Sequence, residues 1–151
     1  MAEAYIALGS NMGDKESWLR FGIDMLEGAG AVKRVSNFYV TAPVGFVEQD
    51  DFLNAAAMVE TSMTPAALLQ YLLEIEQMAG RERTVKNGPR TLDLDILFYD
   101  SLVIEEPGLT IPHPRLHERM FVLLPLSGIA PDLVHPVLGK TVAQMKADLV
   151  S

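Results

Sequence analysis

The chain has 151 residues, 49% of them hydrophobic, and a chain of this length can bury a core of its own. Twelve Lys and Arg residues against twenty Asp and Glu residues give a formal net charge of -8, which disfavours binding to nucleic acids and acidic lipid surfaces. The absence of cysteine excludes disulfides, thiolate metal sites and thiol nucleophiles. We expect a single domain over residues 1–151, monomeric and cytoplasmic, with no nucleic-acid or membrane partner.

The first part of the chain predicts a strand, a helix and two further strands. Residues 4–8 form an apolar run that ends at Gly9 and is typical of a buried strand. Asp14 can cap the next helix, in which apolar residues recur at helical spacing between Trp18 and Leu26. Residues 35–40 and 52–61 are rich in β-forming or apolar residues, and we expect them to pair as neighbouring strands.

The second part predicts another helix and another strand. Thr64 and Pro65 suit the N-cap and first turn of a helix whose apolar stripe continues to Ala79 and closes at Gly80. A strand is expected over residues 92–99, followed by helices near residues 118–126 and 141–149. The order βαββαβ predicts an α+β, ferredoxin-like antiparallel sheet with helices on one face, plus C-terminal helical additions.

Asp93 and Asp95 are the most informative pair of polar residues. Side chains alternate along a strand, so the two carboxylates share one face while Leu92, Leu94 and Ile96 share the other. Their Cα atoms are roughly 7 Å apart, which allows both to hold one cation or a pair of cations. The same face is expected to continue into Leu97 and Tyr99 and to be partly covered. Carboxylate oxygens without a His or Cys ligand favour magnesium, although such a pair taken alone is more often a solvated face.

A basic stretch precedes these aspartates in an otherwise acidic protein. It contains Arg81, Arg83, Lys86 and Arg90 within ten residues. Phosphoryl transfer depends mainly on positioning and on charge neutralisation, and a basic loop beside a metal site can supply both. Without the aspartates, a solvated loop would be the better interpretation.

Two other polar segments give weaker signals. The loop of residues 9–14 follows a strand and opens a helix, so its amides could face an anion, but it lacks the spacing of a Walker or dinucleotide motif and is more typical of a tight turn. His113 and His117 are four residues apart, yet neighbouring prolines disfavour a helix there and no third zinc ligand follows. His113 and Arg119 could bind phosphate or could be ordinary surface groups.

Four segments together resemble one family. Residues 88–96 (GPRTLDLDI) resemble the signature of the 6-hydroxymethyl-7,8-dihydropterin pyrophosphokinases of folate biosynthesis, and residues 6–11 (IALGSN), 52–56 (FLNAA) and 111–114 (IPHP) follow the family's order. The resemblance spans nearly the whole chain. It implies that ATP donates a pyrophosphoryl group to the hydroxymethyl group of the pterin and leaves as AMP.

The resemblance also implies roles for particular residues. Asp93 and Asp95 would bind two magnesium ions, and Arg81 and Arg90 would neutralise the transferring group, so that these four residues form the catalytic set. The residues expected around ATP are Glu76, Arg83, Ile96, Thr110, His113 and Arg119, with the backbone near Ile96 and Thr110 reading adenine. The residues expected around the pterin are Thr41, Pro43, Val44, Phe52, Asn54 and Phe121.

A second functional class is also compatible with this fold. A non-catalytic, ferredoxin-like regulatory module could keep a nucleotide and metal site without turnover, because a fold alone does not determine function. The aspartate pair together with Arg81 and Arg90 favours the enzyme, since a binding module does not need both. Release of AMP that depends on a pterin alcohol distinguishes the two classes.

Overall fold

The computed structural model describes residues 1–41, 51–80 and 91–150. No helix among them is long and apolar enough to cross a membrane. In chain order the elements are β1 (Ala2–Ser10), α1 (Lys15–Leu26), β2 (Gly30–Val35), β3 (Tyr39–Thr41), β4 (Phe52–Thr61), α2 (Pro65–Met78), β5 (Asp93–Tyr99), β6 (Ile104–Glu106), β7 (Leu109–Ile111), the 3₁₀ turn η1 (Leu116–Glu118), α3 (Met120–Ile129) and α4 (Val142–Val150).

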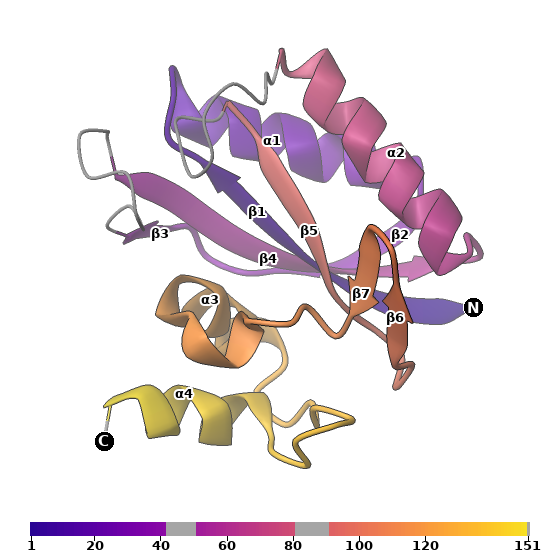
Figure 1. Cartoon of the computed structure of the whole chain (residues 1–151). Helices are drawn as coiled ribbons and strands as arrows, with labels where there is room; N and C mark the ends of the chain where they lie inside the picture. Colours follow the sequence, from indigo (N-terminus) through magenta and orange to yellow (C-terminus); the bar gives the residue numbers. More distant parts are fainter. Residues whose placement is uncertain (42–50, 81–90, 151) are drawn as a thin grey trace.

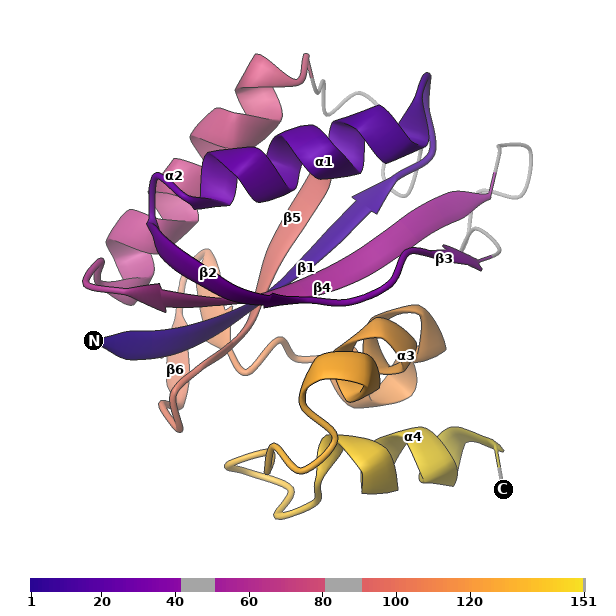
Figure 2. The ribbon, with the colours of Figure 1, turned by 180° about the vertical axis from the view of Figure 1, so that it is seen from behind.

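The main sheet has the strand order β2-β4-β1-β5, and each neighbouring pair is antiparallel. Strand β3 also pairs with β4, and β6 and β7 form a separate hairpin. Helices α1 and α2 cover one face of the sheet, whereas α3 lies on the other face with α4 outside it (Figure 1, Figure 2). The predicted ferredoxin-like α+β fold, with its C-terminal helical additions, is confirmed.

Both long helices begin at the residues that the sequence predicted. The carboxylate of Asp14 accepts the backbone N–H of Ser17 at 3.1 Å at the start of α1. The hydroxyl of Thr64 accepts the N–H of Ala67 at 3.2 Å before α2, where Pro65 occupies the first turn. These contacts satisfy backbone donors that a helix leaves without an internal partner.

The sheet separates two apolar cores. On the side of α1 and α2, buried leucines of the helices pack against Ile6, Leu8 and Leu94 of the central strands. On the side of α3, Leu123 and Leu126 pack in a cluster that also contains Ala56 of β4. Successive residues of a strand point to opposite faces, so the central strands contribute to both cores.

The strand predicted over residues 35–40 was placed wrongly. Strand β2 ends at Val35 and β3 begins only at Tyr39. The interruption is at Ser36, whose N–H donates to the carbonyl of Ala56 at 2.8 Å and whose hydroxyl accepts the N–H of Ala56 at 2.9 Å. The hydroxyl therefore takes the place of a backbone acceptor, and regular pairing stops for three residues.

The alternation predicted for β5 also breaks. Tyr5 pairs with Phe98 and Ile6 pairs with Ile96, so Leu97 is an extra residue in β5, as in a β-bulge. Leu97 and Phe98 both belong to the core under α3, whereas Tyr99 belongs to the core under α1 and α2. The expectation that Tyr99 shares the face of the aspartates is wrong, because the bulge shifts the alternation.

Gly30 tests how tightly the sheet edge is packed. A Cβ at this position would lie 2.0 Å from the carbonyl oxygen of Glu60, so the backbone would have to move. We expect Gly30→Ala to lower the free energy of unfolding by about 1–3 kcal/mol in urea denaturation. Gly128→Ala in α3 is the matched control, because its nearest neighbour would be the Tyr39 hydroxyl at 3.7 Å. Equal stabilities of the two variants would contradict this packing.

Candidate active site

A row of directly paired residues crosses the sheet and includes residues of the predicted pterin and metal sites. Tyr39 of β3 pairs with Asn54 of β4, Asn54 pairs with Gly9 of β1, and Gly9 pairs with Asp93 of β5. Directly opposed residues of antiparallel strands point to the same face, so these side chains lie on one side of the sheet. Ala56, two residues from Asn54, packs in the core under α3 and identifies that side.

The predicted pterin residues in the described part of the chain lie on this face. Phe52 and Asn54 are two residues apart on β4, and Thr41 of β3 pairs with Phe52. The amide of Asn54 is buried and its Nδ2 donates to the hydroxyl of Thr41. Phe121 is half-buried in α3 and packs against the core of the same face. The fold therefore brings Thr41, Phe52 and Asn54 together, with Phe121 on the helix that covers them.

Asp93 and Asp95 are half-buried on β5 and point to the same face as Asn54. Between them, the N–H of Leu94 donates to Oε2 of Glu76 at 2.7 Å. Glu76 is only 3% exposed and comes from α2, so this bond ties α2 to the strand that carries both aspartates. Among the described residues, no group of three His, Asp or Glu side chains could hold a metal ion together.

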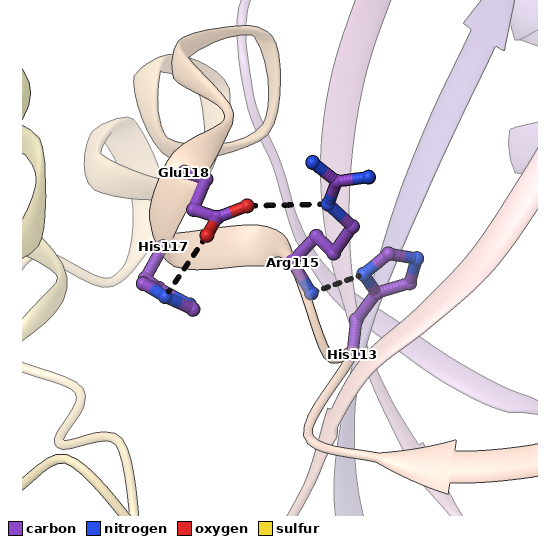
Figure 3. Close-up of polar contacts among 4 residues, drawn as sticks. All are labelled: His113, Arg115, His117 and Glu118. Atoms are coloured by element: carbon purple, nitrogen blue, oxygen red, sulfur yellow. Dashed lines mark hydrogen bonds and ion pairs between the residues drawn. The ribbon is translucent and has the colours of Figure 1, made fainter.

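His113 is fixed beside the outer edge of β5. Its N–H donates to the carbonyl of Leu97 at 3.1 Å, directly after the cis peptide bond between Ile111 and Pro112. Its Nδ1 accepts the N–H of Arg115 at 3.3 Å, which leaves the proton of the neutral ring on Nε2 (Figure 3).

The charge state of His113 follows from its surroundings. Burial first, and then the guanidinium of Arg119, lower the pKa of this imidazole to about 4, against a smaller opposing effect of the Asp93 carboxylate. The ring is therefore a neutral hydrogen-bond donor near pH 7. On the adjacent turn, Glu118 accepts from Arg115 at 3.1 Å and lies 3.8 Å from His117 (Figure 3).

Other residues predicted around the nucleotide occupy different settings. The side chain of Ile96 is buried in the core under α1 and α2, so only its backbone is available to a ligand. Thr110 is exposed on β7 opposite Glu105. The guanidinium of Arg119 lies 5.5 Å from the ring centre of Phe121, which links a residue predicted for ATP to one predicted for the pterin.

An open pocket of about 270 Å³ adjoins His113. Its walls include Thr110 and all three histidines of the sequence, together with aliphatic residues of the loop before α4. His117 and His135 were not among the predicted site residues, because no spacing in the sequence links residues 113, 117 and 135. Gly9 was also missed, although its position between a strand and a polar loop marked the segment.

Five predicted residues lie outside the described part of the chain. They are Pro43 and Val44 of the predicted pterin pocket and Arg81, Arg83 and Arg90 of the predicted basic loop. Their assignments stay predictions.

The pKa of His113 gives a prediction for solution experiments. The ordinary pKa of histidine is 6.5, and that of His113 in the folded chain is about 4. Between these two pH values the unfolded chain binds a proton at this residue that the folded chain does not bind. This contribution therefore lowers stability as the pH falls through that window. An NMR titration of the ring protons should place the midpoint near pH 4. In Arg119→Gln the midpoint should rise, since a nearby positive charge is removed. A midpoint near 6.5 in the unchanged protein would contradict the burial of the ring.

The comparisons with known proteins identify a class and then a family. A ferredoxin-like sheet that carries paired carboxylates, a neutral imidazole donor and half-buried aromatic side chains suits an enzyme of phosphoryl transfer. Residues 5–131 match the family model described as 7,8-dihydro-6-hydroxymethylpterin-pyrophosphokinase. The chain belongs to this family, which confirms the resemblance, and the family name agrees with the predicted enzyme class and reaction.

Relatives named 2-amino-4-hydroxy-6-hydroxymethyldihydropteridine pyrophosphokinase support this membership. The chain is 49% identical to the one from Bacillus subtilis over 128 residues, which cover 83% of this chain and 77% of the relative. It is 42% identical to the one from Methylorubrum extorquens over 151 residues, which cover 99% of this chain and 94% of the relative.

Other similar proteins are longer. The chain is 43% identical to the folic acid synthesis protein FOL1 of Dictyostelium discoideum, covering 96% of this chain but only 22% of FOL1. The Plasmodium falciparum HPPK-DHPS structure matches with a TM-score of 0.80 at 16% identity, over 99% of this chain and 45% of that chain. At this identity the structural match supports the fold alone.

Proposed function

We propose that this chain transfers the pyrophosphoryl group of ATP to 6-hydroxymethyl-7,8-dihydropterin and releases AMP. The hydroxyl oxygen of the pterin would attack the β-phosphorus, the bond from that phosphorus to the AMP oxygen would break, and the hydroxyl proton would pass to solvent. The observation that carries the proposal is the cross-strand row, which puts Asn54 of the predicted pterin pocket and Asp93 of the predicted metal site on one face. Release of AMP only when both ATP and the pterin alcohol are present tests it.

Asp93 and Asp95 are suitable ligands for two magnesium ions. Both offer hard oxygen ligands from one half-buried face, and two carboxylates leave coordination positions for water and for phosphate oxygens. Bound magnesium would neutralise charge on the triphosphate. The bond from Glu76 to the N–H of Leu94 would hold the strand, and hence both carboxylates, at a fixed distance from α2.

The settings of His113 and Arg119 support the nucleotide roles that the resemblance implies for them. The Nε2–H of neutral His113 would donate to a phosphate oxygen, and Arg119 would add a positive charge from the start of α3. Glu76 would act on the nucleotide site through the backbone of β5. The backbone near Ile96 and Thr110 would read adenine, whereas Arg81, Arg83 and Arg90 are proposed from the resemblance alone.

The pterin would lie between the faces of Phe52 and Phe121. Aromatic faces together with a few polar groups suit a flat heterocycle. Asn54 would hydrogen-bond the edge of the ring, and the backbone and side chains of Thr41, Pro43 and Val44 would close the pocket.

We further propose that the chain acts as one domain, as a monomer, and in the cytoplasm where ATP is available. Strand β1 and the C-terminal helices α3 and α4 share one core on one face of the sheet, which favours a single unit. Light scattering coupled to size-exclusion chromatography tests the monomer, since a dimer would double the mass of 16.6 kDa.

Replacing Asp93 or Asp95 with Asn should lower turnover roughly 100-fold or more. An amide is a poor ligand for a hard cation, so the cation that would neutralise the charge on the transferring group is held less well. Thermal melts provide a second measurement. Magnesium with a non-hydrolysable ATP analogue should raise the melting temperature of the unchanged protein and have little effect on either variant. Asp24→Asn, on the exposed face of α1, is the control and should behave like the unchanged protein. Wild-type turnover in either site variant would exclude the metal role.

Phe52→Ala should weaken pterin binding about five- to ten-fold without changing ATP binding, since one face of the ring sandwich is removed. Phe121→Ala should weaken pterin binding too, but it also removes the ring beside Arg119 and should therefore lower ATP affinity modestly. Calorimetric titration of each variant with each ligand measures both effects. Equal losses for ATP and pterin in Phe52→Ala would show that the pterin lies elsewhere.

A further inference from the structure

Arg34 of the edge strand β2 is hydrogen-bonded to the end of α3. Its Nη1 donates to the carbonyl of Ile129, the last residue of that helix, at 2.7 Å. Within residues 1–41, 51–80 and 91–150, this is the one hydrogen bond that joins α3 to the main sheet. Its two ends are 95 residues apart in the chain, so no local pattern in the sequence announces it.

A bulge in β2 directs Arg34 toward α3. Val32 pairs with Val59 of β4, whose side chain lies in the core under α1 and α2. The next pair is Arg34 with Met58, so Lys33 is an extra residue in β2. Met58 lies in the core under α3, and directly opposed residues share a face of the sheet. Without the extra residue, Lys33 would take this place and Arg34 would face the opposite helices.

The guanidinium suits the end of a helix. The last carbonyls of a helix have no internal partner and carry partial negative charge, so a cation beside them is favourable. Helix α3 has no basic residue in its own last turn. Arg34 therefore supplies from the sheet a charge that the helix lacks, and it does so through a bond of defined direction.

Apolar packing alone constrains α3 less than it would an amphipathic helix. Residues 120–126 (MFVLLPL) are all apolar, so this part of the helix has no polar face that sets its rotation. Pro125 also lacks the N–H that would bond to the carbonyl of Phe121, which weakens the first turns of the helix. Hydrophobic burial is non-directional. The bond from Arg34 thus adds a constraint that the apolar contacts do not provide.

The other end of α3 carries predicted contacts for both substrates. Arg119, expected near ATP, is the N-cap residue, and Phe121, expected against the pterin, lies in the first turn. Ile129 follows Phe121 by eight residues, which is about 12 Å along a helix. Arg34 is therefore outside the proposed site and can act on it only through the helix.

We infer that Arg34 is a positioning residue that holds the C-terminal end of α3 against β2 and thereby keeps Phe121 and Arg119 in place for the two substrates. The inference rests on the proposed function and adds a residue to it. Without the bond, α3 would spend part of its time displaced, and the apparent affinity for each ligand would fall by the fraction of time in place. The first ligand to bind would restore the helix for the second, so coupling between the ligands should increase.

Arg34→Met tests this role, because it removes the charge and the donors but keeps an unbranched side chain. We expect the Kd for magnesium with a non-hydrolysable ATP analogue, and KM for the pterin, each to rise roughly three- to five-fold, with kcat changed less than about two-fold. In saturating pterin, the Kd for the analogue should return to within about two-fold of that of the unchanged protein. Calorimetric titration with and without the pterin measures this coupling. Arg34→Lys should restore part of the affinity, since it keeps the charge without the planar head group.

Two control variants separate the position of α3 from charge and from stability. Lys33→Met removes the neighbouring cation, whose Nζ lies 3.7 Å from Glu60 within the sheet, and should bind both ligands like the unchanged protein. Gly30→Ala should destabilise the same strand without changing either affinity. Hydrogen exchange of the α3 amides, measured without ligands, should be about ten-fold faster in Arg34→Met and unchanged in Lys33→Met.

The outcomes distinguish this inference from the function on which it rests. No pterin-dependent release of AMP by the unchanged protein would contradict the proposed function, while hydrogen exchange would still test the bond from Arg34 to α3. Unchanged exchange, or unchanged coupling between the ligands, in Arg34→Met would overturn the positioning role. Equal losses of affinity in Lys33→Met or in Gly30→Ala would also overturn it, because charge or stability would then account for them. If Arg34→Met does not fold, Arg34→Gln is compared with Lys33→Gln by the same measurements.

Discussion

The position of β1 between β4 and β5 is the constraint on which the rest of the structure depends. β1 pairs with β4 over its whole length and with β5 over most of it. The apolar side chains of β1 that face α1 and α2, among them Ile6 and Leu8, are completely or almost completely buried. A shift of either pairing by one residue would turn these side chains to the wrong face, so burial of the core also fixes which residues stand opposite Gly9.

The bulge at Leu97 connects the sheet to His113, one of the residues predicted to contact the nucleotide. The extra residue bends an edge strand and turns its carbonyl outward, where it accepts the N–H of His113. On the same edge, Glu76 accepts the N–H of Leu94. The carbonyl of Leu97 and the N–H of Leu94 face away from the neighbouring strand, and both are hydrogen-bonded to segments that carry predicted nucleotide residues. The groups that protect this edge of the sheet from further strand pairing thus belong to segments of the predicted site.

Periodicity and caps predicted the parts of the fold that are determined locally. The spacing of apolar residues, together with Asp14 and Thr64, was enough for α1 and α2, and the alternation of aspartate and apolar residues was enough for the start of β5. The interruption at Ser36 and the bulge at Leu97 could not be predicted, because each depends on a partner strand that is distant in sequence. The β6–β7 hairpin was missed although Pro107-Gly108 is a turn signal, and Gly108 has a φ of +80° that glycine adopts readily.

The site shows the same division between local and distant determinants. The types and spacing of Asp93 and Asp95 indicated a cation, and the resemblance supplied Asn54 and Phe52, but neither revealed that Gly9 separates the two groups. The position of Gly9 between them follows only from the register of three strands, and a glycine at the end of a strand looks the same in sequence whether it starts a turn or lies between two predicted site residues. The contact of Arg119 with Phe121 is local by contrast, since Arg119 is the N-cap of α3 and Phe121 lies in its first turn. Because that helix also packs on β3 and β4, a movement of α3 would shift the predicted pterin and nucleotide contacts together. We therefore expect α3 itself, rather than a chain of side chains, to link the predicted pterin and nucleotide contacts.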